Sequence, residues 1–264
     1  MVESCKNCNE VIAVSFCSNC GQKKYKKIDK KYIWDEVQYS VLHTNKGLLY
    51  SIKKILQNPG RTAYEYINGN RVNHYKPILL IFVLSGLSTF ISYKILNLKE
   101  IANVYFAQQH MNSKLMGDVM SFISGYNAIL MLLMVPFFAL TTKIAFKKWG
   151  NNYYEHVVMN AYILSFYTLV SIIIVYPIMF VFRHSPSTFF NITQYSFLMV
   201  PVILVWFFKG FYQDKPLKSI ILKVLGVMGL TILFYLIFMI IVALIGFVFA
   251  MLKGPEALQY IKPK

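Results

Sequence analysis

Hydrophobic residues are gathered into five long stretches between residues 77 and 252, and polar segments separate them. A helix needs about 20 apolar residues to cross a hydrocarbon core of about 30 Å. The stretches are residues 77–96, 121–142, 157–182, 192–211 and 219–252. Prolines inside three of them are compatible with membrane helices, where neighbouring groups satisfy the freed backbone atoms. The pattern predicts an all-α membrane protein with a five-helix transmembrane bundle over residues 77–252 and a tail over residues 253–264.

The last stretch is the longest and allows two interpretations. As one tilted helix it places the tail on the side of the membrane opposite to the N-terminus. As a hairpin it returns the tail to the same side. No strong turn signal interrupts residues 219–252, so we expect a single helix.

Ahead of the first stretch, apolar residues recur at helical spacing between residues 33 and 57. Lys53 and Lys54 lie on the opposite face of the second half of this pattern. The sequence Asn58-Pro59-Gly60 stops a helix, and a short helical pattern with a turn follows it. Amphipathic helices with basic polar faces lie in the plane of the membrane interface. Residues 33–76 are therefore predicted to form amphipathic interfacial helices.

The chain has four cysteines, all within its first 20 residues, arranged as two Cys-x2-Cys pairs. They are Cys5, Cys8, Cys17 and Cys20. Two such pairs supply four thiolates to a tetrahedral zinc ion, and these sites are mostly structural because a catalytic zinc keeps an open position. Gly21 suits a turn with positive φ after the last cysteine. We predict a zinc ribbon over residues 1–22 with a structural Zn²⁺. An iron centre would use the same ligands, and disulfides are disfavoured in a cytoplasmic segment.

A polybasic linker over residues 23–32 follows the cysteines. It contains six lysines, Lys23, Lys24, Lys26, Lys27, Lys30 and Lys31. Because a membrane segment begins about fifty residues later, we interpret these lysines as contacts to anionic lipids, each contributing about 1 kcal/mol. A solvated linker that only sets topology fits the same residues. Nucleic acid is the less favoured partner.

The composition of the chain and the placement of its basic residues predict which way the protein faces in the membrane. The 264 residues are 56% hydrophobic and only 14% charged, with a net charge of +16, whereas soluble domains carry about 25% charged residues. Residues 1–76, 143–157 and 209–223 hold 13, 3 and 4 basic residues, together 20 of the 27. Lys and Arg gather in cytoplasmic flanks of membrane helices. We therefore expect a multi-pass protein of the bacterial cytoplasmic (inner) membrane with a cytoplasmic N-terminus.

The order of these motifs resembles DUF3667, a family of bacterial membrane proteins of unknown function that is common in Bacteroidetes. The resemblance rests on a Cys-Gly-Gln-Lys end to the cysteine pairs, an Asn-Pro-Gly-Arg segment, a Tyr-Ile-Asn-Gly-Asn-Arg segment, a Lys-Pro start to the first stretch and an Asn-Tyr-x-Glu-His element. Its residues are Cys17, Cys20, Gly21, Gln22, Lys23, Pro59, Gly60, Tyr66, Ile67, Gly69, Arg71, Pro77 and residues 152–156. The family pattern has Lys where this chain has Asn70. The resemblance implies no activity.

Polar residues near the membrane boundary form one candidate cluster on the predicted cytoplasmic side. They are Arg61, Glu65, Arg71, Glu155 and His156. The favoured interpretation is ion pairing that docks the segment before the membrane onto the loop between the second and third spans. The alternative is a headgroup-binding or catalytic site with His156 as the base.

Three functions are compatible with the sequence. The favoured one is a non-enzymatic scaffold or anchor whose zinc ribbon docks another protein. The second is a channel or transporter for a small solute, although the five stretches contain no Asp or Glu. The third is a lipid-modifying enzyme that uses Glu155 and His156, and the absence of known catalytic motifs argues against it.

Overall fold

The computed structural model describes residues 3–5, 7–13, 15–21, 47–71, 74–254 and 262. They belong to two units, one up to Gly47 and one from Leu48 onward, and each is described by itself. The predicted polybasic linker, and the predicted interfacial segment before residue 47, lie outside the described residues.

The N-terminal unit contains a small antiparallel sheet of two strands. Strand β1 (Glu3–Ser4) pairs with β2 (Val11–Ile12), so that Glu3 lies opposite Ile12 and Ser4 lies opposite Val11. Ile12 is buried together with Cys5 and Cys17. The core of this unit is therefore built around its cysteines.

The second unit begins with two short helices, α2 (Gly47–Gln57) and α3 (Pro59–Ile67). Asn58 separates them and caps the second, because its side-chain oxygen accepts a hydrogen bond of 2.9 Å from the backbone N–H of Arg61. Pro59 occupies the first turn of α3, where its missing N–H has no consequence. The predicted helix stop is thus also the start of the next helix.

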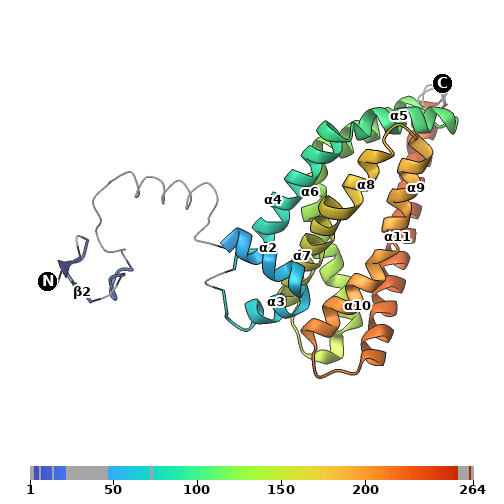
Figure 1. Cartoon of the computed structure of the whole chain (residues 1–264). Helices are drawn as coiled ribbons and strands as arrows, with labels where there is room; N and C mark the ends of the chain where they lie inside the picture. Colours follow the sequence, from blue (N-terminus) through green and yellow to red (C-terminus); the bar gives the residue numbers. More distant parts are fainter. Residues whose placement is uncertain are drawn as a thin grey trace. The chain divides into compact units, whose positions relative to one another are not determined.

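Five long helical segments follow, and each is long and apolar enough to cross a membrane (Figure 1). The segments comprise α4 (Pro77–Phe90) with a π turn (Ile91–Ile95); α6 (Lys114–Ala145); α7 (Tyr153–Val170) with a π turn (Ser171–Val175) and α8 (Tyr176–Val181); α9 (Pro186–Ser196) with α10 (Met199–Phe211); and α11 (Leu217–Lys253). The predicted five-helix membrane bundle is confirmed. The last stretch forms one continuous helix.

Shorter elements join the long helices. Helix α5 (Leu98–Gln108) lies between α4 and α6, and a 3₁₀ turn (Lys147–Trp149) lies between α6 and α7. Helix α7 starts at Asn152 with a capping box, in which the Asn152 side chain and the Glu155 side chain each bond the other residue's backbone N–H. This cap begins the helix before the apolar stretch does.

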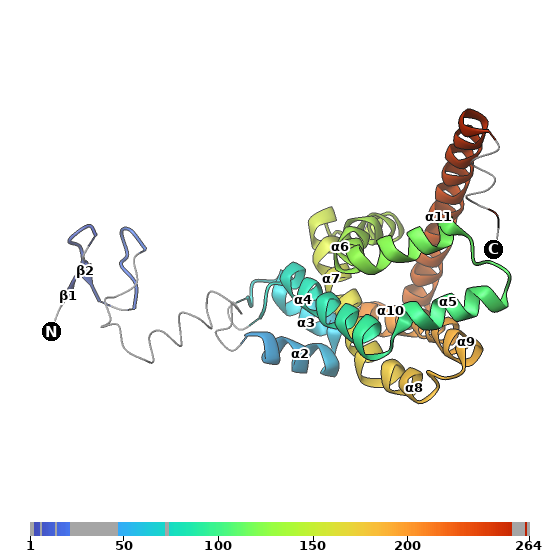
Figure 2. The ribbon, with the colours of Figure 1, turned by 90° about the horizontal axis from the view of Figure 1, so that it is seen from above.

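The main core lies at the end of the bundle where α3 contacts α7 and α10. Its largest fully buried side chains include Leu80, Phe146, Tyr162, Phe207 and Phe208. At the other extreme is α11. None of the most apolar 18-residue window of α11 is buried, compared with half of the corresponding window over α7 and α8. Figure 2 shows α11 running away from α7 and α10 toward its C-terminal end. Packing is therefore concentrated at the α3 end.

Candidate metal centre and the α3 end of the bundle

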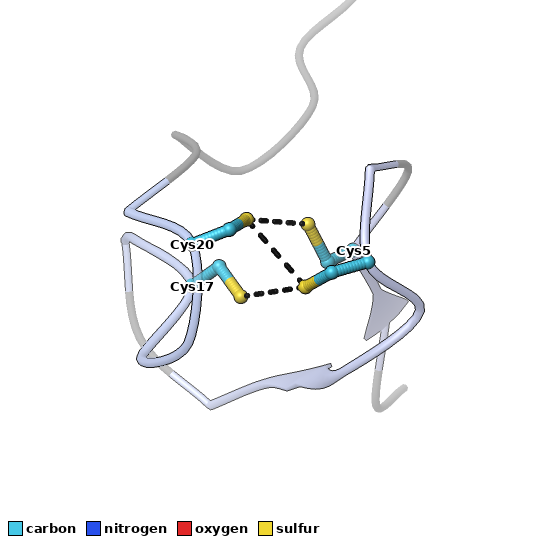
Figure 3. A group of neighbouring side chains, drawn as sticks. Cys5, Cys17 and Cys20 are labelled. Atoms are coloured by element: carbon cyan, nitrogen blue, oxygen red, sulfur yellow. Dashed lines mark hydrogen bonds between the residues drawn. The ribbon is translucent and has the colours of Figure 1, made fainter.

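The four cysteine sulfurs lie within 4.8 Å of one another. Three of the sulfur–sulfur distances are 3.5 Å, joining Cys5 to Cys20 and Cys8 to both Cys17 and Cys20 (Figure 3). A disulfide would bring two sulfurs to about 2.05 Å, so these are free thiols. A tetrahedral ion with bonds of about 2.3 Å to sulfur places its ligands about 3.8 Å apart. The four side chains therefore fit a single bound metal ion.

The two cysteine pairs have the same backbone geometry. The residue after each pair, Asn9 or Gly21, has a positive φ of 62° or 72°. Its N–H donates to the carbonyl of the first cysteine of the pair, at 3.0 Å in both cases. Asn and Gly are the residues that adopt this conformation most readily. Each pair is thus a tight turn that presents both sulfurs to one side.

The Cys8 thiol is held in its protonated form when no cation is present. The backbone of Glu10 lowers the pKa of the Cys8 thiol, whereas burial and the neighbouring thiols raise it. The net effect is a pKa of about 12. Four thiolates at this spacing repel one another, so a cation is needed to hold them together. This donor set favours a soft or borderline metal over Mg²⁺ or Ca²⁺.

In the second unit, α3 contacts α10 through two glycines. A Cβ atom on Gly60 would lie 1.9 Å from the carbonyl oxygen of Phe207, and one on Gly210 would lie 2.4 Å from the Asn58 side-chain oxygen. The two backbones therefore touch, which only residues without a Cβ allow. The ring of Tyr64 also packs edge-on against Phe211, with 5.7 Å between centroids.

The turn after α3 is closed by Arg71. Its Nε donates to the carbonyl of Tyr66 at 3.1 Å, and its guanidinium lies 5.6 Å from the Tyr66 ring centroid. Gly69 supplies the positive φ, 104°, that this turn requires. The Tyr66 ring in turn contacts Tyr162 of α7, with 6.0 Å between centroids. Arg71 therefore satisfies the end of α3 and belongs to no ion pair among the described residues.

His74 lies buried between aromatic rings. Its imidazole contacts Tyr50 of α2 and Tyr66 of α3 edge-on, at 5.2 and 6.2 Å. Both ring nitrogens lack a hydrogen-bond partner. Burial lowers the pKa of His74, the charge of Lys54 lowers it further, and the charge of Glu65 raises it. The neutral imidazole is therefore favoured, and its ring contacts join α2 to α3.

The structure brings Arg61 and Glu65 of the predicted polar cluster together and gives Arg71, Glu155 and His156 other partners. Arg61 and Glu65 form an ion pair of 3.1 Å within α3, and both are at least partly exposed. The Glu155 carboxylate accepts hydrogen bonds from the backbone of Asn152 and the side chain of Asn151. The segment before the membrane is therefore held mainly by backbone contact and aromatic packing.

His156 is fully buried between α6 and α7. Its Nδ1 lies 3.1 Å from the Thr142 hydroxyl, and Asn160 donates to the same oxygen at 2.8 Å. The Thr142 hydroxyl donates to the carbonyl of Phe138, so its oxygen is free only to accept. This assigns the proton of the neutral ring to Nδ1 and leaves Nε2 as an acceptor.

One cleft of about 330 Å³ opens at the α3 end, and Glu155 lies in its wall. Its lining comprises Tyr64, Ile67, Asn68, Asn151, Glu155, Phe211, Tyr212, Gln213, Asp214 and Lys215. The Tyr212 hydroxyl donates to Asn151 at 2.8 Å, and Asn151 donates to Glu155 at 3.0 Å. Burial raises the pKa of Tyr212 above its usual value. Sequence reasoning missed this wall because Asn151 and Tyr212 are 61 residues apart.

One comparison with known proteins gives a match, and it covers the segment that builds this end of the bundle. No curated protein and no solved structure matches the chain. Residues 45–89, which contain α2, α3 and most of α4, match the model of a family described as Protein of unknown function (DUF3667), the same family that the sequence resembles.

Proposed function

We propose that this chain is a multi-pass protein of the bacterial cytoplasmic membrane that acts as a scaffold or anchor. Its N-terminal unit binds a structural zinc ion and docks a second protein at the cytoplasmic face. The observation that carries the proposal is the set of four cysteine sulfurs within 4.8 Å of one another, ahead of five helices long and apolar enough to span a membrane.

The choice of zinc rests on the donor set and its closure. Four thiolates fill a tetrahedral zinc shell completely and leave no open position for a substrate. A unit of about 20 residues has too small a core to fold alone, so metal binding supplies its folding energy. An iron centre with the same ligands is distinguished by its visible absorption.

The docking role rests on the surface of the N-terminal unit. Val11 and Phe16 are 52% and 55% exposed, although the unit buries only a few side chains of its own. We propose that these two side chains contribute to one apolar surface, because contiguous exposed apolar patches mark protein contacts. The six lysines after it, Lys23 to Lys31, are proposed to contact anionic lipids and to hold the unit close to the membrane.

The proposed orientation rests on where the basic side chains lie in the second unit. The end of the bundle with α2 and α3 carries twelve basic residues, Lys53, Lys54, Arg61, Arg71, Lys76, Lys143, Lys147, Lys148, Lys209, Lys215, Lys218 and Lys223. The described residues at the opposite end include Lys94, Lys99, Lys114 and Arg183. Basic flanks remain cytoplasmic, so α3 and the N-terminus face the cytoplasm.

A lipid-modifying activity is less well supported by the geometry. Glu155 serves as the capping residue of α7, and His156 is closed off from solvent and from the cleft surface. A general base needs to reach the proton that it removes. The positions of both side chains are explained by helix capping and helix packing.

The test uses the full-length protein in lipid nanodiscs. We expect one zinc per chain by metal analysis and capture of a cytoplasmic protein that is lost in the Phe16→Ala variant. Ser18→Ala, at an exposed position of the same unit, is the matched control and should retain the partner. Capture that is equal in the wild type and in Phe16→Ala would refute docking through this surface, and absence of bound metal would refute the zinc site.

A further inference from the structure

Helices α4 and α7 contact each other, and both carry buried polar side chains. Ile81 of α4 and Ala161 of α7 share one buried cluster with Val135 of α6. Further along, Ser88 of α4 bonds Tyr176 at the start of α8, with 2.7 Å between the hydroxyl oxygens. From the first of these sites to the second, the residue numbers increase in both helical segments, from Ile81 to Ser88 and from Ala161 to Tyr176. The two segments therefore run in the same direction.

Ser85 and Ser165 lie between these two contacts. Ser85 stands four residues beyond Ile81 and Ser165 four residues beyond Ala161, so helical periodicity places each one turn further along the same face of its own helix. Their exposed fractions are 1% and 0%, and neither hydroxyl has a hydrogen-bond partner.

The neighbouring hydroxyls behave differently. Thr89, Thr168 and Ser171 each donate to the carbonyl four residues earlier in their own helix, at 2.7 to 2.9 Å. This is the usual way for a buried Ser or Thr to be satisfied in a helix. Ser85 and Ser165 depart from it, so close packing of small residues does not by itself explain their hydroxyls.

Buried polar groups continue toward the α3 end. The Tyr162 hydroxyl and both nitrogens of His74 lack partners and lie in side chains at least nine-tenths buried. The Tyr66 ring lies between them, 6.0 Å from Tyr162 and 6.2 Å from His74 by ring centroids. Unpaired groups therefore lead from the α3 end into the α4–α7 interface.

The opposite end of the interface is marked by two π turns. One follows α4 over Ile91–Ile95 and the other follows α7 over Ser171–Val175. The second ends two residues before Pro177, whose missing N–H interrupts the helical bonding pattern. Such turns widen a helix locally and often occur at functional sites. The Ser88–Tyr176 pair lies beside them.

The chemical character of these buried polar groups indicates which kind of ligand they would bind. A polar atom buried in an apolar region without a partner is costly, and a small hydrogen-bonding molecule removes that cost. In the described part of the second unit, the buried side chains with hydrogen-bonding groups belong to Ser, Thr, His, Asn and Tyr, and none of them is Asp, Glu, Lys or Arg. The lining therefore offers hydrogen bonds without charge, which suits an uncharged guest.

We propose that the α4–α7 interface is a path across the membrane for water and small uncharged hydrogen-bonding solutes, with His74 and Tyr162 at one end and the Ser88–Tyr176 pair at the other. The path goes beyond the scaffold function and does not depend on the zinc unit. Ser85 and Ser165 form its narrow middle section.

The direct test is osmotic permeability of proteoliposomes, with water, urea and glycerol as the probes. Wild-type vesicles should pass at least one probe faster than protein-free vesicles. Ser85→Leu fills the path and should return that rate to the protein-free level. Ser121→Leu, at an exposed position of α6, is the matched control and should keep the wild-type rate. Protein-free rates for all three probes in wild-type vesicles would overturn the proposal.

A second measurement does not depend on a bulky variant. The thiol of a Ser165→Cys variant should react with a small methanethiosulfonate reagent in the folded protein, and urea in excess should slow the reaction. The native cysteines all lie in the first 20 residues, so mass spectrometry of the α7 peptide reports the new thiol alone. An unreactive thiol at position 165, in a variant that elutes as the wild type does, would contradict the path.

Discussion

Gly60 of α3 lies directly against the backbone of Phe207 in α10, and a Cβ atom at residue 60 would come within 1.9 Å of the Phe207 carbonyl oxygen. This contact attaches the segment before the membrane to the penultimate span. It explains why Gly60, within the segment that matches the family, is a glycine: any side chain would separate the two helices.

Replacing Gly60 by Ala should therefore destabilise the bundle. The clash is with backbone, which cannot rotate away, so we expect a loss of about 1–3 kcal/mol or more, as in other overpacked sites. Thermal unfolding in detergent measures it. Gly86→Ala is the control, because nothing lies within 4 Å of a Cβ there, and its unfolding temperature should be unchanged or higher. Similar melting of the two variants would show that the Gly60 contact is unimportant.

Much of this fold follows from hydrophobic length alone. Each of the five apolar runs has about 20 residues or more, which is the length that a helix needs to cross a membrane. Few structures other than five membrane helices fit such runs. The ends of the helices are different, because hydrophobicity does not mark them. Helix α6 begins at Lys114, behind a Ser113 cap whose hydroxyl accepts from the Met116 N–H at 3.2 Å. The predicted run started at residue 121 because Lys114 and Asp118 interrupt the apolar pattern in the first two turns.

The candidate sites were predictable to unequal degrees. The metal centre is local, since four cysteines within 16 residues specify it by spacing. The α3 end is non-local: the Gly60–Phe207 contact joins residues about 150 positions apart, and nothing in the pattern around Gly60 indicates α10. The predicted ion-pair cluster grouped residues by side of the membrane, whereas burial and capping separate Glu155 from its neighbour His156.

The capping role of Glu155 gives a prediction that separates structure from catalysis. Glu155→Ala removes half of the capping box and should cost about 1 kcal/mol in unfolding experiments. Glu155→Gln keeps an acceptor for the Asn152 N–H and should retain most of the stability. If Gln were as damaging as Ala, the negative charge itself would be required, and the cleft beside it would become a candidate ligand site.

His74 should make the stability of the second unit depend on pH. Burial lowers its folded-state pKa below the usual 6.5, so the unfolded chain binds a proton more readily than the folded chain. The contribution is complete above pH 6.5 and is lost as the pH falls toward the folded-state pKa. Unfolding temperatures at about pH 8 and about pH 5.5, on either side of the usual histidine pKa, measure this loss.

The His74→Phe variant is the control for that experiment. It keeps the edge-on ring contacts with Tyr50 and Tyr66 but has no titratable group. The acid-induced loss of stability should be smaller in this variant than in the wild type, and the difference isolates His74 from His156 and the other histidines. An identical pH dependence in both proteins would mean that the folded state tolerates a charged His74.

Metal occupancy of the N-terminal unit should also fall with pH. Each cysteine must lose its proton to bind an ion, and the pKa of Cys8 is raised to about 12 without one, so protons and metal compete for the same sulfurs. We expect one zinc per chain at neutral pH, with release as the solution is acidified or a chelator is added. Cys8→Ser leaves three sulfurs and should lose the ion at a higher pH than the wild type does, whereas Ser18→Ala should not. Retention of the metal by Cys8→Ser at the wild-type level would mean that this sulfur is not a ligand, although it lies 3.5 Å from both Cys17 and Cys20.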